Sequence, residues 1–473
     1  MNQAVENISI AVSVNKLLDK QRTAHLNNPY PSLEQRIDRI DRLVDMVLSN
    51  KEKLIDAVAA DFGNRSPLIT GITDLLPVVS AAKHAKKHLK NWMRTERRKS
   101  NFPLDLLGAR SSVEHLPLGV VDSISPWNFP INLSLGPAVD IFAAGNRMML
   151  KPSELSRETS AVISEIVSRA FDEKEFAVVQ GGPDVAYAFA SVKFDHLLFT
   201  GSPNIARSVA KVAATNLVPI TLELGGKNPT IIAPSANLHL AAEKLMWAKT
   251  LNGGQVGLSP DLVYVHSSVL DEFVDQCKAA TAKMYNDFKS DEAFTNIISD
   301  LHAKRLRELV EEAEDQGATV IKLGEEQGNC IPPSLVLNAK YSSKIMREEI
   351  FGGPLPLIRY DDLEDVARLI NKGESPLALY YLGEDNKEID YLSRHTLSGG
   401  MTVNDFFAHN KQDDLPFGGV GESGTGACHG HDGFKNFSHA RAIYKQSKRD
   451  PIKFIRPPFT DKLRTFVDSQ LTK

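Results

Sequence analysis

Cysteine is scarce in this sequence, with three residues among 473. Cys277, Cys330 and Cys428 are too few and too widely spaced for a disulfide framework. The chain has no apolar run close to the ~20 residues of a membrane-spanning helix, and no cationic start with a long apolar segment marks a secretory signal. It also lacks the excess of positive charge typical of nucleic-acid binders, because its formal net charge is −4. These absences predict a cytoplasmic protein that binds neither nucleic acids nor membranes.

The pattern along the chain is that of an α/β protein. From Gly119, short apolar runs alternate with helical stretches, and a second such cycle begins after Gly226. This alternation is typical of parallel sheets with helices on their faces. In the second cycle we expect helices over residues 237–250, 268–287, 301–316 and 362–371. The segment SSVEHLPLG and the tail from Ala440 lie outside both cycles, so they are candidate arms for subunit contacts.

Two turns after expected strands contain groups that suit a nucleotide. In HLLFTGSPNIAR the strand ends before Gly201, and Ser202 and Pro203 suit the N-cap and the first helical position. A helix N-terminus at this edge of a sheet can bind a phosphate or pyrophosphate, although an ordinary capped turn has the same pattern. In MMLKPSE, Lys151 and Glu154 offer donors and acceptors for ribose hydroxyls. The alternative is a pair of solvated charges.

Two further motifs carry candidate catalytic groups. In TLELGGK, Glu223 lies at an apolar strand end and Gly225 leaves room for a ligand, so we expect a carboxyl with a raised pKa that can act as a general base. In ISPWNFP, Asn128 is a candidate oxyanion donor. A solvated glutamate and a turn asparagine are the alternatives. GVGESG lacks the strand and helix of a dinucleotide fingerprint, and CHGH has no second ligand pair, so no metal is expected.

Taken together, the sequence resembles the NAD(P)-dependent aldehyde dehydrogenase superfamily. The motifs that carry the resemblance occur in the family's order between about residues 35 and 445: PLGVV, ISPWNFP, NRMMLKPSE, FTGS, LELGGK, NGGQ, EEIFG, GGMTVND and LPFGGVGESG. QDDLPFGGVG and ACHGHDGFKNFSHA look closest to the coniferyl aldehyde dehydrogenase branch. The resemblance implies an α/β fold with three parts. These are a Rossmann-like cofactor domain (1–110 and 120–224), an α/β catalytic domain (225–400), and an oligomerisation arm and tail (111–119 and 425–473) that makes homodimers.

The resemblance also implies roles for particular residues. Asn128 would be the oxyanion donor and Glu223 the base that activates water. The residues expected to bind the cofactor are Trp127, Lys151, Glu154, Gly201, Ser202, Gly225, Glu349 and Phe351. Glu154 favours NAD, with NADP as the alternative cofactor. The substrate would be an aldehyde, and Phe406, Phe407 and Trp127 favour an aromatic one unless they are core residues.

One departure from the family pattern affects the chemistry directly. The family's nucleophilic cysteine stands two residues after the glutamine of GGQ, and here the run NGGQVGLSP places Gly257 there. A glycine cannot form the thiohemiacetal that precedes hydride transfer. Ser259 and Cys428 are not favoured as substitutes. Ala206 replaces a frequent glycine and could crowd the cofactor, and Gly353 shifts a proline.

Three interpretations of Gly257 remain open. The chain is a natural family member with impaired or altered chemistry, a pseudoenzyme in the strict case. Alternatively, it is a variant of an active enzyme in which the nucleophile has been replaced. In the third interpretation it is a non-catalytic NAD-binding or structural subunit, and in the extreme case cofactor binding is lost as well.

Overall fold

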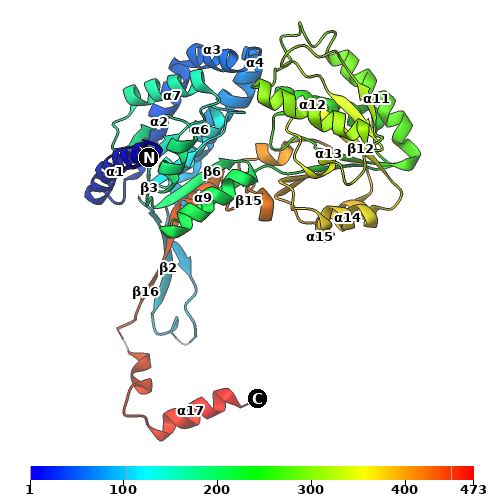
Figure 1. Ribbon diagram of the computed structural model, residues 1–473. Helices are drawn as coiled ribbons and strands as arrows, with labels where there is room; N and C mark the ends of the chain where they lie inside the picture. The colour runs from blue at the N-terminus through cyan, green and yellow to red at the C-terminus, as the bar shows by residue number, and fades with distance from the viewer. Residues whose placement is uncertain (1, 103, 449, 473) are drawn as a thin grey trace.

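Three β-sheets organise the chain in the computed structural model, which describes residues 2–102, 104–448 and 450–472. A six-stranded and a seven-stranded sheet, each covered by helices, form the body, and a three-stranded sheet projects from it (Figure 1). The arrangement confirms the predicted α/β class. In the part of the chain that is described, no helix is both long and apolar enough to span a bilayer.

The first sheet has the order β15-β7-β6-β3-β4-β5 and is parallel except for β15, which runs antiparallel to β7. Its strands are β3 (Val120–Ile124), β4 (Arg147–Lys151), β5 (Phe176–Val178), β6 (His196–Gly201), β7 (Ile220–Leu224) and β15 (Gly424–Thr425). All residues of β3 and β4 are buried. This burial explains their short, mostly apolar runs, since helices cover both faces of such a sheet.

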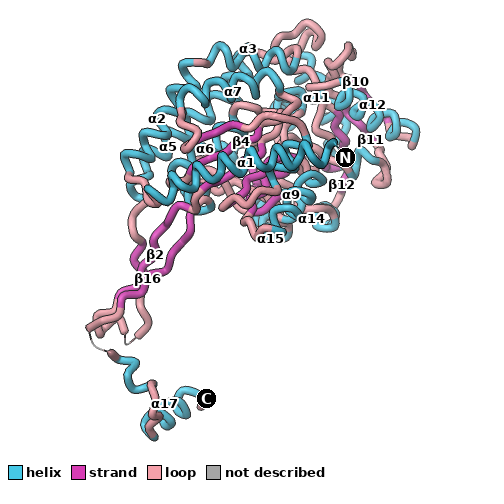
Figure 2. Tube along the Cα trace, turned by 60° about the vertical axis from the view of Figure 1, so that its left-hand side comes forward, coloured by secondary structure: helices cyan, strands magenta, loops and turns pink. Residues whose placement is uncertain are grey.

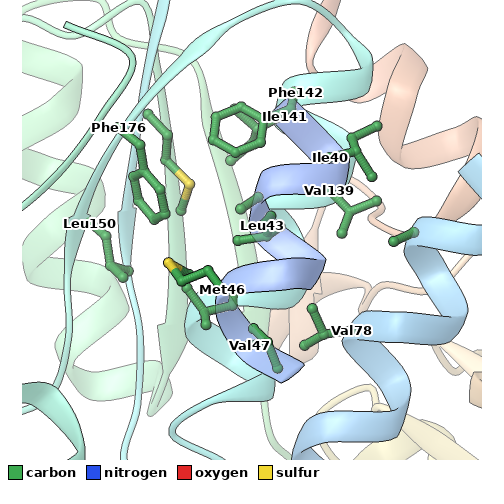
Figure 3. Packing of buried hydrophobic residues seen from close by; sticks show 14 of the residues in the cluster. Ile40, Leu43, Met46, Val47, Val78, Val139, Ile141, Phe142, Leu150 and Phe176 are labelled. Atoms are coloured by element: carbon green, nitrogen blue, oxygen red, sulfur yellow. The ribbon is translucent and has the colours of Figure 1, made fainter. Parts of the chain in front are cut away.

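Helices from the N-terminal half and one late helix surround the first sheet. They are α1 (Asn2–Asn27), α2 (Leu33–Ser49), α3 (Lys51–Phe62), α4 (Pro67–Thr70), the π-helical η1 (Gly71–Leu75), α5 (Leu76–Trp92), α6 (Asn132–Ala143), α7 (Arg157–Ala170), α8 (Pro183–Ala190), α9 (Pro203–Thr215) and α16 (Gly430–Asn436). Apolar side chains of α2, α5 and α6 pack together beside β4 and β5 (Figure 3). The other face packs against α1, α8 and α9.

The second sheet has the order β10-β11-β12-β9-β8-β13-β14, parallel except for β10. Its strands are β8 (Pro229–Ile232), β9 (Leu262–His266), β10 (Thr319–Lys322), β11 (Ser334–Leu337), β12 (Pro354–Tyr360), β13 (Ala378–Leu382) and β14 (Gly400–Val403). One face packs against α10 and α11, and the other against α12, α13, α14 and α15.

The predicted helices of the second cycle are confirmed to within three residues at their ends. The helices of this part are α10 (Leu238–Thr250), α11 (Leu270–Met284), α12 (Asp300–Asp315), α13 (Lys344–Arg347), α14 (Leu363–Lys372) and α15 (Asn386–His395). Single 3₁₀ turns are η3 (Ser267–Val269), η4 (Ala408–Lys411) and η5 (Gly421–Ser423), and η2 (Leu251–Gly254) is a turn whose Asn252 and Gly253 have non-helical dihedral angles.

The projecting sheet consists of β1 (Glu96–Arg98), β2 (Arg110–Pro117) and β16 (Ser438–Lys445). The central strand β2 pairs antiparallel with both neighbours. After β16, the chain forms η6 (Pro451–Ile455) and α17 (Asp461–Leu471), which lie away from the body (Figures 1 and 2). Residues 424–436 belong with the body, because β15 pairs with β7 and α16 packs against α5 and α6.

Candidate active site

A cavity of about 2030 Å³ lies between the two α/β units. Its walls include the carboxyl ends of β3, β4, β6 and β7, where open parallel sheets bind their ligands. Sites for single small molecules enclose roughly 300–1,000 Å³, so this cavity has room for two ligands. All eleven residues predicted for the site line it: Trp127, Asn128, Lys151, Glu154, Gly201, Ser202, Glu223, Gly225, Gly257, Glu349 and Phe351.

Lys151 and Glu154 form an ion pair in the cavity wall. The Lys151 Nζ lies 2.7 Å from a Glu154 carboxylate oxygen. The lysine side chain is 3% exposed and the glutamate side chain is 40% exposed. The pair therefore combines a fixed cation with a carboxylate that a ligand can reach, and neither residue is a fully solvated charge.

The turn between β6 and α9 follows the predicted order of strand, cap and helix, but β6 extends through Gly201 and the Ser202 side chain makes no capping hydrogen bond. Ser202 is the N-cap in an extended conformation, and Pro203 occupies the first helical position. Asn204 and Ile205, in the first turn of α9, line the cavity. The unpaired N–H groups and the positive end of the helix dipole favour an anionic group in front of such a turn.

Two of the three departures from the family pattern lie outside the cavity. The expectation that Ala206 could crowd a cofactor is wrong, because its side chain is 1% exposed and packs in the apolar core with Phe199 and Leu224. Gly353 lies in a tight passage, where an added β-carbon would come within 3.1 Å of the Pro332 carbonyl oxygen and the Pro333 Cα. Both positions are explained by packing.

Glu223 is a buried carboxyl at the end of β7. The side chain is 6% exposed. Burial raises its pKa well above the ordinary value of 4.5, as the strand-end position predicted. Among the described residues, none provides a hydrogen-bond partner of full geometry to either carboxylate oxygen. The side chain that interacts with the carboxylate is the thiol of Cys428.

The turn that precedes Gly257 is built from left-handed residues. Asn252, Gly253 and Gly254 have φ values of 52°, 62° and 78°. A β-carbon on Gly254 would lie 2.4 Å from the carbonyl oxygen of Gly352, so glycine is required there. Gln255 is fully buried. Its Nε2 donates to the carbonyls of Asn252 and Asn296, at 2.8 and 3.0 Å, and its Oε1 accepts from the Ile298 N–H at 2.9 Å.

At Gly257 the cavity wall consists of backbone alone. A β-carbon added there would meet the Gly225 Cα and the Leu377 Cδ2 at 3.9 Å, which is ordinary van der Waals contact. The Asn128 side chain is held close by, because its Nδ2 donates to the Gln255 carbonyl at 3.1 Å. The backbone thus has room for a side chain at residue 257.

The loop of Asn128 is held by a buried ion pair that sequence reasoning missed. Arg65 donates from Nη1 to the Asn128 carbonyl at 2.8 Å and from Nη2 to an Asp74 oxygen at 2.5 Å. The other Asp74 oxygen accepts the Ile131 and Asn132 N–H groups at 3.1 and 3.3 Å. Residues 65 and 74 lie far from ISPWNFP in the sequence, and no local motif marks them.

Glu349 and Phe351 line the cavity next to Gly225 and Trp127. Glu349 accepts the Gly226 N–H at 3.2 Å, and its carboxyl lies where a Gly225 side chain would be, 2.0 Å from an added β-carbon. Burial, with a smaller contribution from Asp261, raises the pKa of Glu349 to about 7. Phe351 has a left-handed φ of 54°, and its ring meets that of Trp127 edge to face at 5.4 Å.

The cavity contains fewer of the predicted funnel aromatics than expected. Trp127 and Phe407 line it. Phe406 instead is 2% exposed and packs against Tyr380 in the core, with 4.7 Å between ring centroids. Phe129, Trp247, Tyr341 and Phe417 also line the cavity and were not singled out from the sequence. The aromatic character of the wall thus rests on a partly different set of residues.

The three cysteines are free and buried. Cys277 and Cys330 belong to apolar clusters and do not line the cavity, whereas Cys428 lines it. Ser259 is 3% exposed and is not a lining residue. Cys428 is therefore the cysteine that shares a cavity with the predicted site residues.

Comparisons with known proteins identify the family. The model of the aldehyde dehydrogenase family matches residues 11–443. A probable coniferyl aldehyde dehydrogenase of Caulobacter vibrioides is 41% identical over 470 residues, which are 97% of each chain. A coniferyl aldehyde dehydrogenase of a Pseudomonas species is 43% identical over 444 residues, 92% of each chain. The substrate-bound structure of Staphylococcus aureus AldH superposes with a TM-score of 0.91 at 28% identity, over 97% of this chain and 99% of that one. The resemblance and its coniferyl aldehyde dehydrogenase branch are confirmed, and the chain belongs to the aldehyde dehydrogenase family.

Proposed function

We propose that this protein binds NAD(P) and an aldehyde in the cavity, and that it lacks the usual thiol-dependent oxidation of the aldehyde. The observation that carries the proposal is Gly257, a backbone-only position on the cavity wall where the family pattern requires a cysteine. A thiolate forms a covalent bond with the aldehyde carbon before hydride leaves. Since glycine has no group for this bond, we expect oxidation slower by several powers of ten.

The cavity has the features that NAD(P) needs. Lys151 and Glu154 offer a donor and an acceptor for the adenosine ribose hydroxyls. The first turn of α9, with Gly201 and Ser202 before it, suits the pyrophosphate. When bound, the nicotinamide ring supplies a hydride acceptor. The Glu154 carboxylate disfavours a phosphorylated ribose, so we propose NAD, with NADP as the alternative.

A second group of lining residues supports an aldehyde subsite. Glu349, Phe351, Trp127 and Gly225 form the wall that would face the nicotinamide end of the cofactor. The buried Glu223 would accept a proton from water or from a hydrated aldehyde, because burial raises its pKa and so makes its carboxylate a stronger base. The Asn128 amide would donate to the aldehyde oxygen. The aromatic wall favours an aromatic aldehyde.

We further propose that the protein acts as a homodimer in the cytoplasm. The projecting sheet supports dimerisation, because β16 is an edge strand with unpaired backbone groups along one side. The three cysteines are free rather than paired, which is the usual state of thiols in a reducing compartment.

Two measurements test the proposal: NAD binding by calorimetry, and the rate of NADH formation by the unchanged chain, by Gly257→Cys and by Gly257→Ala. We expect the unchanged chain to bind NAD and to form NADH from aromatic aldehydes slowly at best. The Gly257→Cys variant has room for its new side chain, since the nearest atoms to the added β-carbon are 3.9 Å away, and it should gain activity by several powers of ten. Gly257→Ala is the matched control, because it fills the same space without a thiol and should stay as slow as the unchanged chain.

Three results would contradict parts of this proposal. Fast oxidation by the unchanged chain would refute the importance assigned to Gly257. Absence of NAD binding would favour a structural subunit. A Gly257→Cys variant that folds and binds NAD but stays inactive would show that the loss of function extends beyond the nucleophile.

A further inference from the structure

Cys428 is fixed in the cavity wall by its backbone. It follows β15 and precedes α16 in the chain. Its N–H donates to the Phe417 carbonyl at 2.7 Å, and its carbonyl accepts the Phe417 N–H at 3.2 Å. The side chain is 6% exposed, and the residue lines the same cavity as Asn128 and Gly257. The thiol is therefore held at a defined place within the proposed aldehyde site.

The Glu223 carboxyl lies near the backbone pairing that holds Cys428, because it approaches Gly418, which directly follows the pairing residue Phe417. A β-carbon built on Gly418 would lie 3.3 Å from the Glu223 Oε1. Among the described residues, none gives either Glu223 oxygen a hydrogen bond of full geometry, and the Cys428 thiol is the side chain whose proximity acts on the pKa of this carboxyl. A buried carboxyl without a full set of partners is unusual unless it serves a reaction or a ligand. The thiol thus has a proton acceptor beside it.

We propose that Cys428 is a nucleophilic thiol of this cavity, which adds reversibly to the aldehyde carbonyl while Glu223 accepts its proton. The inference rests on the proposed function insofar as it takes the cavity to be an aldehyde site. In the addition, a carbon–sulfur bond forms between the Cys428 Sγ and the carbonyl carbon, and the carbonyl π bond opens. The thiol proton passes to the Glu223 carboxylate and then to the new alkoxide oxygen. The product is a thiohemiacetal, and nothing is oxidised or reduced.

The surroundings of Cys428 and Glu223 favour transfer of the thiol proton directly to the Glu223 carboxylate. Burial raises the pKa of the Cys428 thiol well above 9, and the neighbouring charges of Glu223 and Asp140 raise it further. His429 does not supply a cation, because burial lowers its pKa to about 4. A free thiolate is therefore disfavoured. Transfer of the proton to Glu223 conserves the charge of the pair, and the burial that raises the pKa of this carboxyl makes its ionised form the stronger acceptor.

A chromophoric aldehyde tests the proposal directly on the full chain without cofactor. Addition of a thiol to the carbonyl of 4-(dimethylamino)cinnamaldehyde shortens its conjugated system and bleaches its long-wavelength absorbance. We expect reversible bleaching of one equivalent per chain. Cys428→Ala should abolish it, and Glu223→Gln should slow it by about 100-fold, the scale of a lost general base. Cys330→Ala removes a buried thiol outside the cavity and should leave the bleaching unchanged.

The outcomes separate this inference from the proposed function. Thermal melting and NAD calorimetry establish that each variant is folded. Bleaching that persists in Cys428→Ala, or that is absent from an unchanged chain with intact NAD binding, overturns the role of Cys428 and leaves the proposed function standing. Cys428-dependent bleaching by a chain that does not bind NAD supports the thiol and contradicts the cofactor part of the proposed function.

Discussion

Replacing Arg65 by methionine should destabilise the part of the first unit that holds Asn128. Arg65 and Asp74 form an ion pair in which both side chains are fully buried. Methionine keeps much of the apolar stem between Phe62 and Phe129, whose ring centroids lie 4.9 and 5.2 Å from the guanidinium carbon. It leaves the Asp74 carboxylate buried without its counter-charge. Loss of one partner of such a pair costs about 3–5 kcal/mol.

The lost hydrogen bond to the Asn128 carbonyl, 2.8 Å long, adds about 1 kcal/mol to that cost. We therefore expect the free energy of unfolding to fall by roughly 4–6 kcal/mol. Urea titration followed by tryptophan fluorescence measures the loss, because Trp127 precedes Asn128 directly. With a urea dependence of about 3 kcal/mol per molar, the midpoint should fall by roughly 1–2 M.

The matched partner is Asp74→Leu, together with the double variant. Asp74→Leu leaves Arg65 as the unpaired buried charge and also removes the acceptor of the Ile131 and Asn132 N–H groups. The double variant contains no buried charge at this place, so its loss should lie closer to that of either single variant than to their sum. Additive losses, or an Arg65→Met variant within about 0.5 kcal/mol of the unchanged chain, would refute this reasoning.

Three shorter predictions follow from the cavity walls. Glu154→Ser removes the carboxylate beside Lys151, so the ratio of NADP to NAD affinity should rise about tenfold, equal to 1.4 kcal/mol, in calorimetry; an unchanged ratio would contradict the ribose assignment. Because the pKa of Glu349 is raised to about 7 from 4.5, folding favours its protonated form, and stability should fall as pH rises between these values. In Glu349→Gln, the melting temperature should decrease less between these pH values than in the unchanged chain. Gly254→Ala, with φ +78° and a β-carbon 2.4 Å from a backbone oxygen, should lower the melting temperature more than Gly317→Ala, which has a positive φ but open space.

The features predictable from sequence are those encoded within one short segment. The FTGSPN turn specifies its own strand end, cap and helix start, and Glu223 has the buried strand-end position that its apolar neighbours indicate. The order of the motifs indicates the family, and the family resemblance in turn assigns residues such as Glu349, which no local pattern identifies. The predicted residues of the first unit, from Trp127 to Gly225, line one cavity because strands that alternate with helices place their carboxyl ends at one edge of a sheet. Gly257, Glu349 and Phe351 reach the same cavity from segments that precede β9 and β12.

What sequence could not show depends on contacts between distant segments. The Arg65 guanidinium reaches Asn128 across 63 positions, and Ala206 turns to the core because of the helix phase rather than its local sequence. The proximity of Cys428 to Glu223 is of the same kind. The two residues lie near one edge of the first sheet, because β15 pairs antiparallel with β7. The two strands are separated by about 200 residues, and no sequence pattern predicts their pairing.

The surroundings of Gly257 bear on whether the site has lost its function entirely. A cavity without a ligand has no need of a left-handed turn or of buried amides with matched partners, since both cost free energy. Here the turn at 252–254 is strained or close-packed at each residue, and both polar atoms of the Gln255 amide have partners. The wall around Gly257 thus remains fully built while the thiol is absent. Such a wall is suited to hold a ligand. Glu223 and Cys428, which line the same cavity, are then the groups that can react with that ligand.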